Sequence, residues 1–315
     1  MTVSTVRLMN QFLEVTVLPG VGAKIFDLIH RPTGYNFLWH NPRIQPQPYP
    51  IDANFDNYWC GGWDDGFPTC EPCVFRGEQY PGLGELRSLR WTVEESSLEF
   101  ASFSAFGPIN PVAAKKTVRL NGGSVEITYE IKNLGPAGID FLWGTHPAYA
   151  VSDQTVLHVP ARTGIVGVSL HPSLGVPGQR YAWPLLETPQ GVVNLSKIIG
   201  PRPNLACGHY ATDLSTGWYA VEHTDRVQSL LFEFELQACP HLWMWLSYGG
   251  WRGYHVAIVE PWTSCPVTLL DAEQAGTHRH LEPGESFRTS VRATPGQPGQ
   301  GVNDLLRAVS VQKKT

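Results

Sequence analysis

The sequence predicts an all-β protein with long loops and little helix. Glycine and proline, with 31 and 26 residues, make up about 18% of the 315-residue chain, against a usual share of ~12%, which suits many strands joined by turns. Hydrophobic and polar residues alternate along several segments, as they do in strands with one buried face. Almost no segment keeps a helical period for long, and the 42% hydrophobic content supplies a sizeable core.

The alternation defines the elements of the N-terminal half. Five segments are expected to form strands: 12–18, 23–29, 98–106, 114–120 and 124–131. The last two flank Asn121-Gly122-Gly123, which is a strong hairpin signal. In the second arm of this hairpin Val125 and Ile127 face one way, while Glu126 and Thr128 face the other. This pattern predicts a half-buried antiparallel strand.

The C-terminal half contains four more candidate strands, at 230–237, 241–247, 254–260 and 287–293, and a short terminal helix is expected over 302–310. Segments 40–84 and 160–215 are rich in Pro and Gly and are expected to be long loops. The aromatic residues of the first indicate an ordered binding loop. No change in composition marks a boundary, so residues 1–315 are expected to form a single domain, the last ~20 a tail or short helix.

Charge and composition exclude several classes of function. The chain has 23 Lys and Arg against 28 Asp and Glu, a net charge of −5 and a pI near 6.1, which is too acidic for a nucleic-acid binder. No apolar run approaches the ~20 residues of a membrane helix. Arg7, Asn10 and Glu14 interrupt any signal-peptide core. The sequence therefore predicts a cytoplasmic protein that binds neither nucleic acid nor membranes.

The cysteines give no sign of a metal or redox centre. Without a secretory signal, free thiols are expected. Cys70-Glu71-Pro72-Cys73 has the spacing of a zinc or redox pair, but a structural zinc site needs a second pair of ligands, and a redox motif needs a βαβ context. No metal or other cofactor is expected.

The segment Tyr254 to Thr263 carries the first candidate catalytic group. Side chains alternate along a strand, so Val256, Ile258 and Glu260 share one face. Pro261 keeps Glu260 out of helical backbone angles and places it at or near a strand end. A carboxylate held this way beside a large ring can act as a desolvated base with a raised pKa. The alternative is an ordinary strand-end Glu hydrogen-bonded to a loop.

Asp140 to Tyr149 repeats this design, with a strand-like run that ends in His146 before Pro147. Histidine has the side chain whose unperturbed pKa lies nearest neutrality, so it gives or takes a proton readily. A structural histidine is the alternative. Together, His146 and Glu260 form an acid–base pair that can move one proton onto a substrate and another off it.

Other residues suit sugar binding. Trp63-Asp64-Asp65 and Glu260-Pro261-Trp262 each place an aromatic ring beside a carboxylate, a combination that fits the apolar face and the hydroxyls of a sugar. Trp63 and Trp262 are candidate stacking residues, although tryptophan also fills β-sheet cores. Glu85 and Arg87, two residues apart on one strand face, can bind vicinal hydroxyls; a solvated ion pair is the alternative.

These motifs together resemble the aldose 1-epimerase (galactose mutarotase-like) superfamily. The resemblance spans about residues 12–290 and is carried, in order, by Val17 to Ile25, Thr33 to Trp39, Gly61 to Pro68, Gly84 to Arg87, His146-Pro147 and Glu260-Pro261-Trp262. It implies a large antiparallel β-sandwich with a sugar site on its concave face, with Glu260 as base and His146 as acid. It also places Asp213 on the sugar hydroxyls. Leu83 stands where many members have a second histidine.

The resemblance implies a mutarotase that interconverts the α and β anomers of an aldose by acid–base ring opening. The expected partner is a small sugar, and the protein is expected to be a monomer or homodimer. Two alternatives remain open from sequence: a non-catalytic sugar-binding or sugar-sensing protein on the same scaffold, and another carbohydrate enzyme. A hydrolase favours paired carboxylates, which a Glu and a His do not supply.

Overall fold

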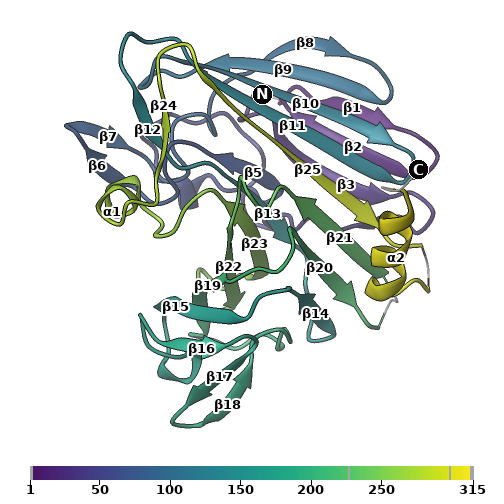
Figure 1. Ribbon diagram of the computed structural model, residues 1–315. Coiled ribbons are helices and arrows are strands. Elements are labelled where there is room, and N and C mark those ends of the chain that lie inside the picture. The colour runs from purple at the N-terminus through teal and green to yellow at the C-terminus, as the bar shows by residue number, and fades with distance from the viewer. Residues whose placement is uncertain (1–2, 226–227, 298, 313–315) are drawn as a thin grey trace.

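Two large antiparallel sheets, packed face to face, make up most of the described chain (Figure 1). The computed structural model describes residues 3–225, 228–297 and 299–312. The fold is an all-β sandwich, as the alternation predicts. Both sheets are antiparallel throughout their described pairings, which places consecutive strands beside one another in several hairpins.

The larger sheet runs in the order β1 (Val6–Met9), β2 (Leu13–Leu18), β3 (Lys24–His30), β5 (Trp63–Gly66), β13 (Gly144–Tyr149), β23 (His255–Trp262), β22 (His241–Tyr248), β19 (Ala206–Thr212), β15 (Thr163–Ser169) and β16 (Arg180–Ala182), with β4 (Tyr35–Asn36) beside β3. The smaller sheet runs β14 (Thr155–His158), β20 (Trp218–His223), β21 (Gln228–Phe234), β25 (Ser286–Pro295), β11 (Ser124–Asn133), β10 (Val112–Asn121), β9 (Phe100–Phe106) and β8 (Thr92–Ser96).

The described residues also contain three two-stranded sheets: the hairpins of β6 (Cys73–Phe75) with β7 (Glu78–Tyr80) and of β17 (Leu185–Thr188) with β18 (Gly191–Asn194), and the pair of β12 (Ile139–Phe141) with the distant β24 (Arg279–Leu281). Short 3₁₀ turns lie at η1 (Phe55–Asn57) and η2 (Pro172–Leu174). Helix α1 (Leu269–Gln274) was not expected from the sequence. Helix α2 (Val302–Gln312) was expected, and its Val302 and Leu305 pack on Leu231 of β21. Among the described residues, no helix has the length and apolar character to cross a membrane.

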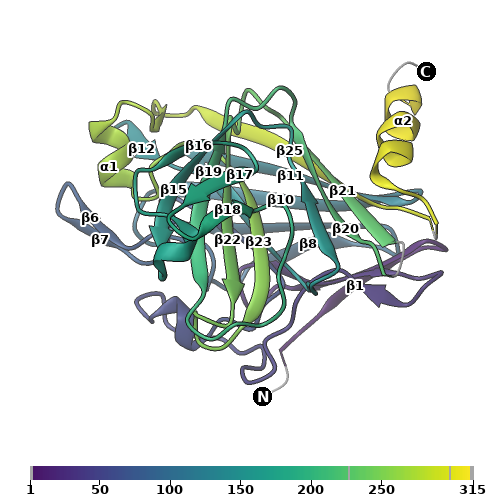
Figure 2. The ribbon, with the colours of Figure 1, turned by 90° about the horizontal axis from the view of Figure 1, so that it is seen from below.

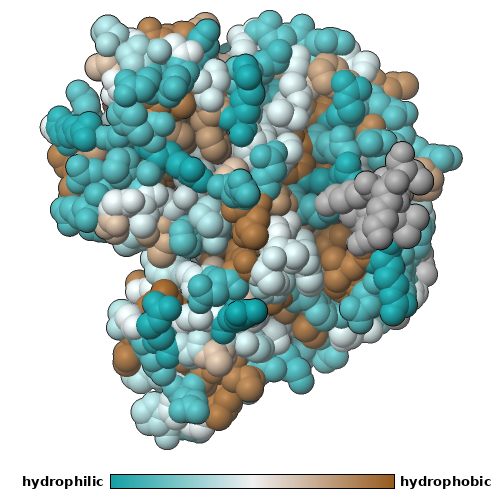
Figure 3. Space-filling model, viewed as in Figure 1, coloured by the Kyte–Doolittle hydropathy of each residue, from teal (hydrophilic) through white to brown (hydrophobic). Residues whose placement is uncertain are grey.

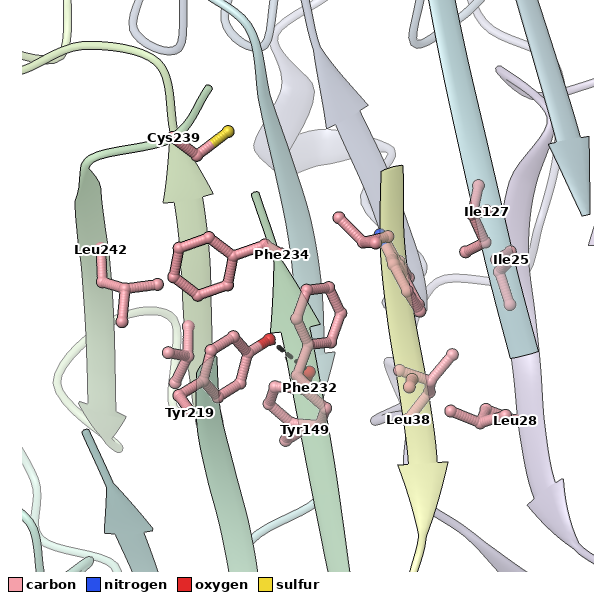
Figure 4. Packing of buried hydrophobic residues seen from close by; sticks show 14 of the residues in the cluster. Ile25, Leu28, Leu38, Ile127, Tyr149, Tyr219, Phe232, Phe234, Cys239 and Leu242 are labelled. Carbon is pink, nitrogen blue, oxygen red and sulfur yellow. Dashed lines mark hydrogen bonds between the residues drawn. The ribbon is translucent and has the colours of Figure 1, made fainter. Parts of the chain in front are cut away.

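The core lies between the two sheets, where their inward side chains meet (Figure 4). Ile25 of β3 and Ile127 of β11 come from opposite sheets and are both fully buried. The hydroxyl groups of Tyr149 on β13 and Tyr219 on β20 hydrogen-bond across the core at 2.6 Å, because a buried hydroxyl needs a partner. The β10–β11 hairpin forms as predicted, with Asn121 paired to Ser124.

Two sequence expectations for the loops were wrong. Segment 160–215 contains β15 to β19, of which β15, β16 and β19 belong to the larger sheet, while Figure 2 shows β17 and β18 in front of it. These strands were missed because several are only three or four residues long and lie among Pro and Gly. Residues 85–89 do not form a strand, since their backbone follows turns and bends. Segment 40–84 is mostly irregular, as expected.

Candidate active site

A cavity of about 950 Å³ lies on the outer face of the larger sheet. Its floor comes from β13, β23, β22, β19 and β15, and its walls come from residues 52–56, 70–72, 79–83 and Trp251. In Figure 3 the surface is indented on the left, between the part that carries β6, β7 and α1 and the part that carries β15 to β18. His146 and Glu260 both lie in this cavity.

The sheet register sets the residues of the floor in a row. Directly paired residues on neighbouring antiparallel strands point to the same face. His146 pairs with Asp64, and Glu260 pairs with Trp243. The pairings on either side of His146 place it opposite Glu260. One row therefore crosses six strands on the outer face, in the order Lys24, Asp64, His146, Glu260, Trp243 and Tyr210.

His146 and Glu260 meet at the centre of this row. The Nε2 atom of His146 lies 3.9 Å from Oε1 of Glu260, and both side chains are buried. Glu260 lies near the end of β23, as expected, since this strand ends at Trp262, whereas the expectation that a strand ends at His146 was wrong, because β13 continues to Tyr149. The proline after each residue keeps it extended, which is also the conformation of a continuing strand.

The surroundings of Glu260 favour its neutral form. Burial raises the pKa of Glu260 to about 8, and the nearby carboxylates of Glu71 and Asp64 act in the same direction. The indole N–H of Trp262 donates to Oε2 of Glu260 at 2.9 Å and lowers the pKa in part. The carboxyl group is thus mainly protonated at pH 7.

The surroundings of His146 also favour its neutral form. Burial lowers the pKa of His146 to about 3, and the nearby charge of Lys24 acts in the same direction. The rings of Phe55 and Trp59 stand edge-on to the imidazole, each with its centroid 6.0 Å away. Nδ1 of His146 has no hydrogen-bond partner among the described residues. At rest the pair therefore holds one titratable proton, on Glu260.

Comparison with known proteins gives a fold and nothing narrower. No protein-family model matches the sequence, and no curated protein matches it significantly. Among solved structures, the Slr1438 protein from Synechocystis sp. PCC 6803 is similar with a TM-score of 0.70 and 18% identity over 94% of this chain and 96% of that one. A galactose mutarotase-like protein from Lactobacillus casei is similar with a TM-score of 0.68 and 14% identity, over 93% of this chain and 100% of that one. A galactose mutarotase related enzyme from Lactobacillus acidophilus has a TM-score of 0.67 and 15% identity, over 95% of this chain and 99% of that one.

The chain has the galactose mutarotase-like fold. At these identities the similarity shows the fold alone. The role of each residue follows from the geometry of this chain.

Trp262 positions Glu260 and does not face the cavity. Its side chain is fully buried and stacks on Trp243, with the ring centroids 4.7 Å apart. The indole lies flat over two glycines of neighbouring strands, since a Cβ atom on Gly66 or Gly144 would come within 2.4 or 2.0 Å of it. The expected sugar contact of Trp262 is therefore corrected to a hydrogen bond that fixes the carboxyl group.

Trp63 and Asp64 also have structural roles. Trp63 points into the core between the sheets, where its ring packs on that of Phe232 with the centroids 5.1 Å apart. Its indole N–H donates to the hydroxyl of Thr145. Asp64 is buried in an ion pair with Lys24 at 3.0 Å and accepts the indole N–H of Trp59 at 3.2 Å. Burial by itself would lower the pKa of Lys24, but Asp64, together with Cys60 and Tyr49, more than offsets this and raises it. Neither Trp63 nor Asp64 is among the described residues that line the cavity.

The other three predicted sugar contacts are also corrected. Glu85 is fully buried and accepts backbone N–H groups of Ile109 and Asn110. Arg87 lies behind the wall, where it donates to the carbonyl oxygens of Gly82 and Ala53 and so ties two wall segments together. Asp213 is exposed beyond the end of β19 and accepts a hydrogen bond from Thr163 at 2.6 Å.

Several cavity residues were missed by sequence reasoning. Trp243 and Trp245 were not among the candidate site residues, yet both line the cavity, as do Tyr210, Trp251 and Glu71. The signal was the β22–β23 hairpin, in which Trp243 pairs with Glu260 and Trp245 with Ile258. His209, which also lines the cavity, hydrogen-bonds to the Tyr181 hydroxyl, and His255 hydrogen-bonds to the Ile199 carbonyl. Among the described residues, no group of three or more His, Cys, Asp and Glu side chains is arranged to hold a metal ion.

Proposed function

We propose that this protein is an aldose 1-epimerase-like mutarotase that interconverts the α and β anomers of an uncharged aldose. The observation that carries the proposal is the 3.9 Å separation of His146 Nε2 and Glu260 Oε1 in the floor of the cavity. Mutarotation needs proton transfer at two oxygens, the ring oxygen and the anomeric hydroxyl, and both are bonded to the same carbon. An acid and a base for this reaction must therefore lie close together.

The protonation state of the pair suits the ring-opened intermediate. For opening, Glu260 as carboxylate takes the anomeric hydroxyl proton while His146 as imidazolium protonates the ring oxygen, and the bond between that oxygen and C1 breaks to leave an aldehyde. Both side chains are then neutral, which is the state that their burial favours. Rotation about C1–C2 and the reverse proton transfers close the ring as the other anomer.

The reactive form of the pair also holds one titratable proton, but this proton lies on His146 instead of Glu260. This form is a minor one in the resting state. A neutral imidazole is too weak an acid to donate to an ether oxygen, so the proton of Glu260 must reach His146 before ring opening. The two groups are close enough to exchange it through a bound hydroxyl or a water. Such a pair titrates as a unit, and each positioned group typically contributes ~10²–10⁴ in rate.

The charge of the cavity favours an uncharged substrate. Asp52, Asp56 and Glu71 line it together with Glu260, whereas no Lys or Arg is found among the described lining residues. Arg252 is not a lining residue, but its Nε atom lies 3.5 Å from Oδ2 of Asp56 and offsets the charge of that carboxylate. A phosphorylated or sulfonated sugar would bring like charge next to these carboxylates, which disfavours its binding.

The test is anomer exchange, measured by NMR saturation transfer for a panel of neutral, phosphorylated and sulfonated aldoses. The wild-type protein should accelerate exchange for at least one neutral sugar. Glu260→Gln should lose ~10²-fold or more of this rate while it still binds the sugar, as measured by calorimetry. Glu95→Gln, which changes an exposed residue on β8, is the matched control and should keep full activity. Binding without acceleration for any sugar would instead identify a non-catalytic sugar-binding protein.

A further inference from the structure

Aromatic side chains on the outer face of the larger sheet lie against glycines of neighbouring strands. A Cβ atom added to Gly208 would come within 3.3 Å of the indole of Trp245, and one added to Gly167 within 2.9 Å of the ring of Tyr210. Trp262 lies across Gly66 and Gly144 in the same way. Because these glycines leave room for rings on the sheet, Trp245 and Tyr210 form an aromatic floor that continues away from Glu260, with the Tyr210 ring inclined at 66° to that of Trp243.

This floor is longer than one sugar ring. It crosses from β23 through β22 and β19 to β15, three strand spacings of about 4.8 Å, or roughly 14 Å in total. The cavity extends along it to Gly167, Val168 and Leu170 of the β15 segment. Its volume of about 950 Å³ lies near the upper end of the ~300–1,000 Å³ found for sites that take drug-sized ligands.

The floor also has polar groups without partners. The indole nitrogens of Trp243 and Trp245 are buried and have no hydrogen-bond partner among the described residues, although buried donors normally have one. A carboxylate and an amide, those of Glu71 and Gln79, also line the cavity. Flat rings with hydrogen-bonding groups around them are what a pyranose needs on its face and at its hydroxyls.

We propose that the cavity contains a second sugar subsite on Tyr210 and Trp245, so that the preferred substrate is an uncharged reducing disaccharide. Its reducing ring lies at His146 and Glu260, where anomerisation takes place, and its second ring lies on the aromatic floor towards β15. The inference rests on the proposed function for the reducing ring. The second subsite itself rests on the floor alone.

The experiment compares kcat/KM for anomer exchange between glucose and a panel of reducing disaccharides that end in glucose, with glucose 6-phosphate as the anionic probe. We expect at least one disaccharide to exceed glucose by ten-fold or more. Tyr210→Ala should reduce this ratio towards one, whereas Tyr210→Phe should retain most of it. Phe106→Ala changes a 70% exposed ring on β9 of the smaller sheet and is the control that should leave the ratio unchanged.

The outcomes separate the subsite from the proposed function. If glucose is accelerated but no disaccharide exceeds it, the second subsite is wrong and the mutarotase proposal stands. A preference for glucose 6-phosphate over glucose and over every disaccharide would overturn the subsite, together with the uncharged-substrate part of the proposed function. If no sugar is accelerated, the mutarotase proposal fails, and tryptophan fluorescence titration decides the subsite by whether a disaccharide binds more tightly than glucose and loses this advantage in Tyr210→Ala.

Discussion

At the scale of single residues, Glu260 and His146 titrate in the reverse of their ordinary order. Burial raises the pKa of Glu260 to about 8 and lowers that of His146 to about 3. Between these values the pair holds one proton, which is the number that the proposed ring opening needs. The rate should therefore be level across weakly acidic and neutral pH and should fall as pH rises above about 8, where the pair loses its proton.

Trp262→Phe tests which group sets this upper limit. The indole N–H stabilises the ionised form of Glu260, and phenylalanine removes the donor while it keeps an aromatic ring. A hydrogen bond to a charged group is worth about 1.5–3 kcal/mol, so the pKa of Glu260 should rise by about one unit or more. The alkaline limb of the rate profile, measured by NMR exchange, should move upwards by the same amount.

Trp91→Phe is the control for this shift. It removes a buried indole N–H that donates to the Leu86 carbonyl, away from the cavity residues. Its alkaline limb should stay at the wild-type pH. An unchanged limb in Trp262→Phe would show that another group controls the upper limit.

The two central residues could be predicted from sequence, and their support could not. His146 and Glu260 each precede a proline that keeps them extended, and each lies on a strand face that alternation reveals. Trp262 was expected to contact the sugar because a ring beside a carboxylate suits one. Nothing local in the sequence shows that Gly66 and Gly144 open a place for this ring in the sheet, since that contact joins three separate strands.

At the scale of elements, these glycines let aromatic rings lie flat in the sheet. Gly144→Ala should therefore force the Trp262 indole off the sheet and shift the Glu260 carboxyl group with it. Overpacking of this kind typically costs about 1–3 kcal/mol of unfolding free energy, and the exchange rate should fall because the acid–base distance changes. Chemical denaturation and NMR exchange measure the two effects.

Gly123→Ala is the matched control for the alanine substitution. It lies in the β10–β11 hairpin, and its added Cβ would meet no atom within 4 Å. Stability and exchange rate should both stay close to the wild-type values. A Gly144→Ala protein with wild-type stability and rate would mean that the Trp262 ring can move without displacing Glu260.

Strands were predicted well where alternation is long and poorly where it is short. The β10–β11 hairpin was found because ten-residue arms alternate around a Gly-Gly turn. Strands β16 to β18 have only three or four residues, too few for a period of two to be recognised among Pro and Gly. The part of the cavity floor formed by β15 and β19, with Tyr210, was therefore not predicted.

At the scale of the whole molecule, the site depends on the larger sheet being closed on its inner face by the smaller one. This packing buries the strands that carry His146 and Glu260, while segments 52–56 and 79–83 cover the outer face around them. The buried carboxyl group then opposes stability when it ionises. Function and stability are thereby linked through pH.

The pKa of Glu260 sets the direction in which stability changes with pH. Its native pKa of about 8 lies above the ordinary value of 4.5, so between these values the native state holds a proton that the unfolded chain has lost. The group therefore contributes stability that is fully present below pH 4.5 and is lost as pH rises through 8. Glu260→Gln removes this dependence, and because one pKa unit corresponds to about 1.4 kcal/mol, the difference between pH 5 and pH 8.5 should reach about 4 kcal/mol.

Denaturant unfolding of both proteins at pH 5 and at pH 8.5 measures the effect. The variant should gain stability relative to the wild type by the stated amount as pH rises, because every other titrating group is common to both and cancels in the difference. His146 does not obscure the result, since its pKa of about 3 keeps it neutral in the native state at both pH values, in both proteins. A difference that does not change with pH would mean that Glu260 ionises as it does in water, and the one-proton pair would then lose its physical basis.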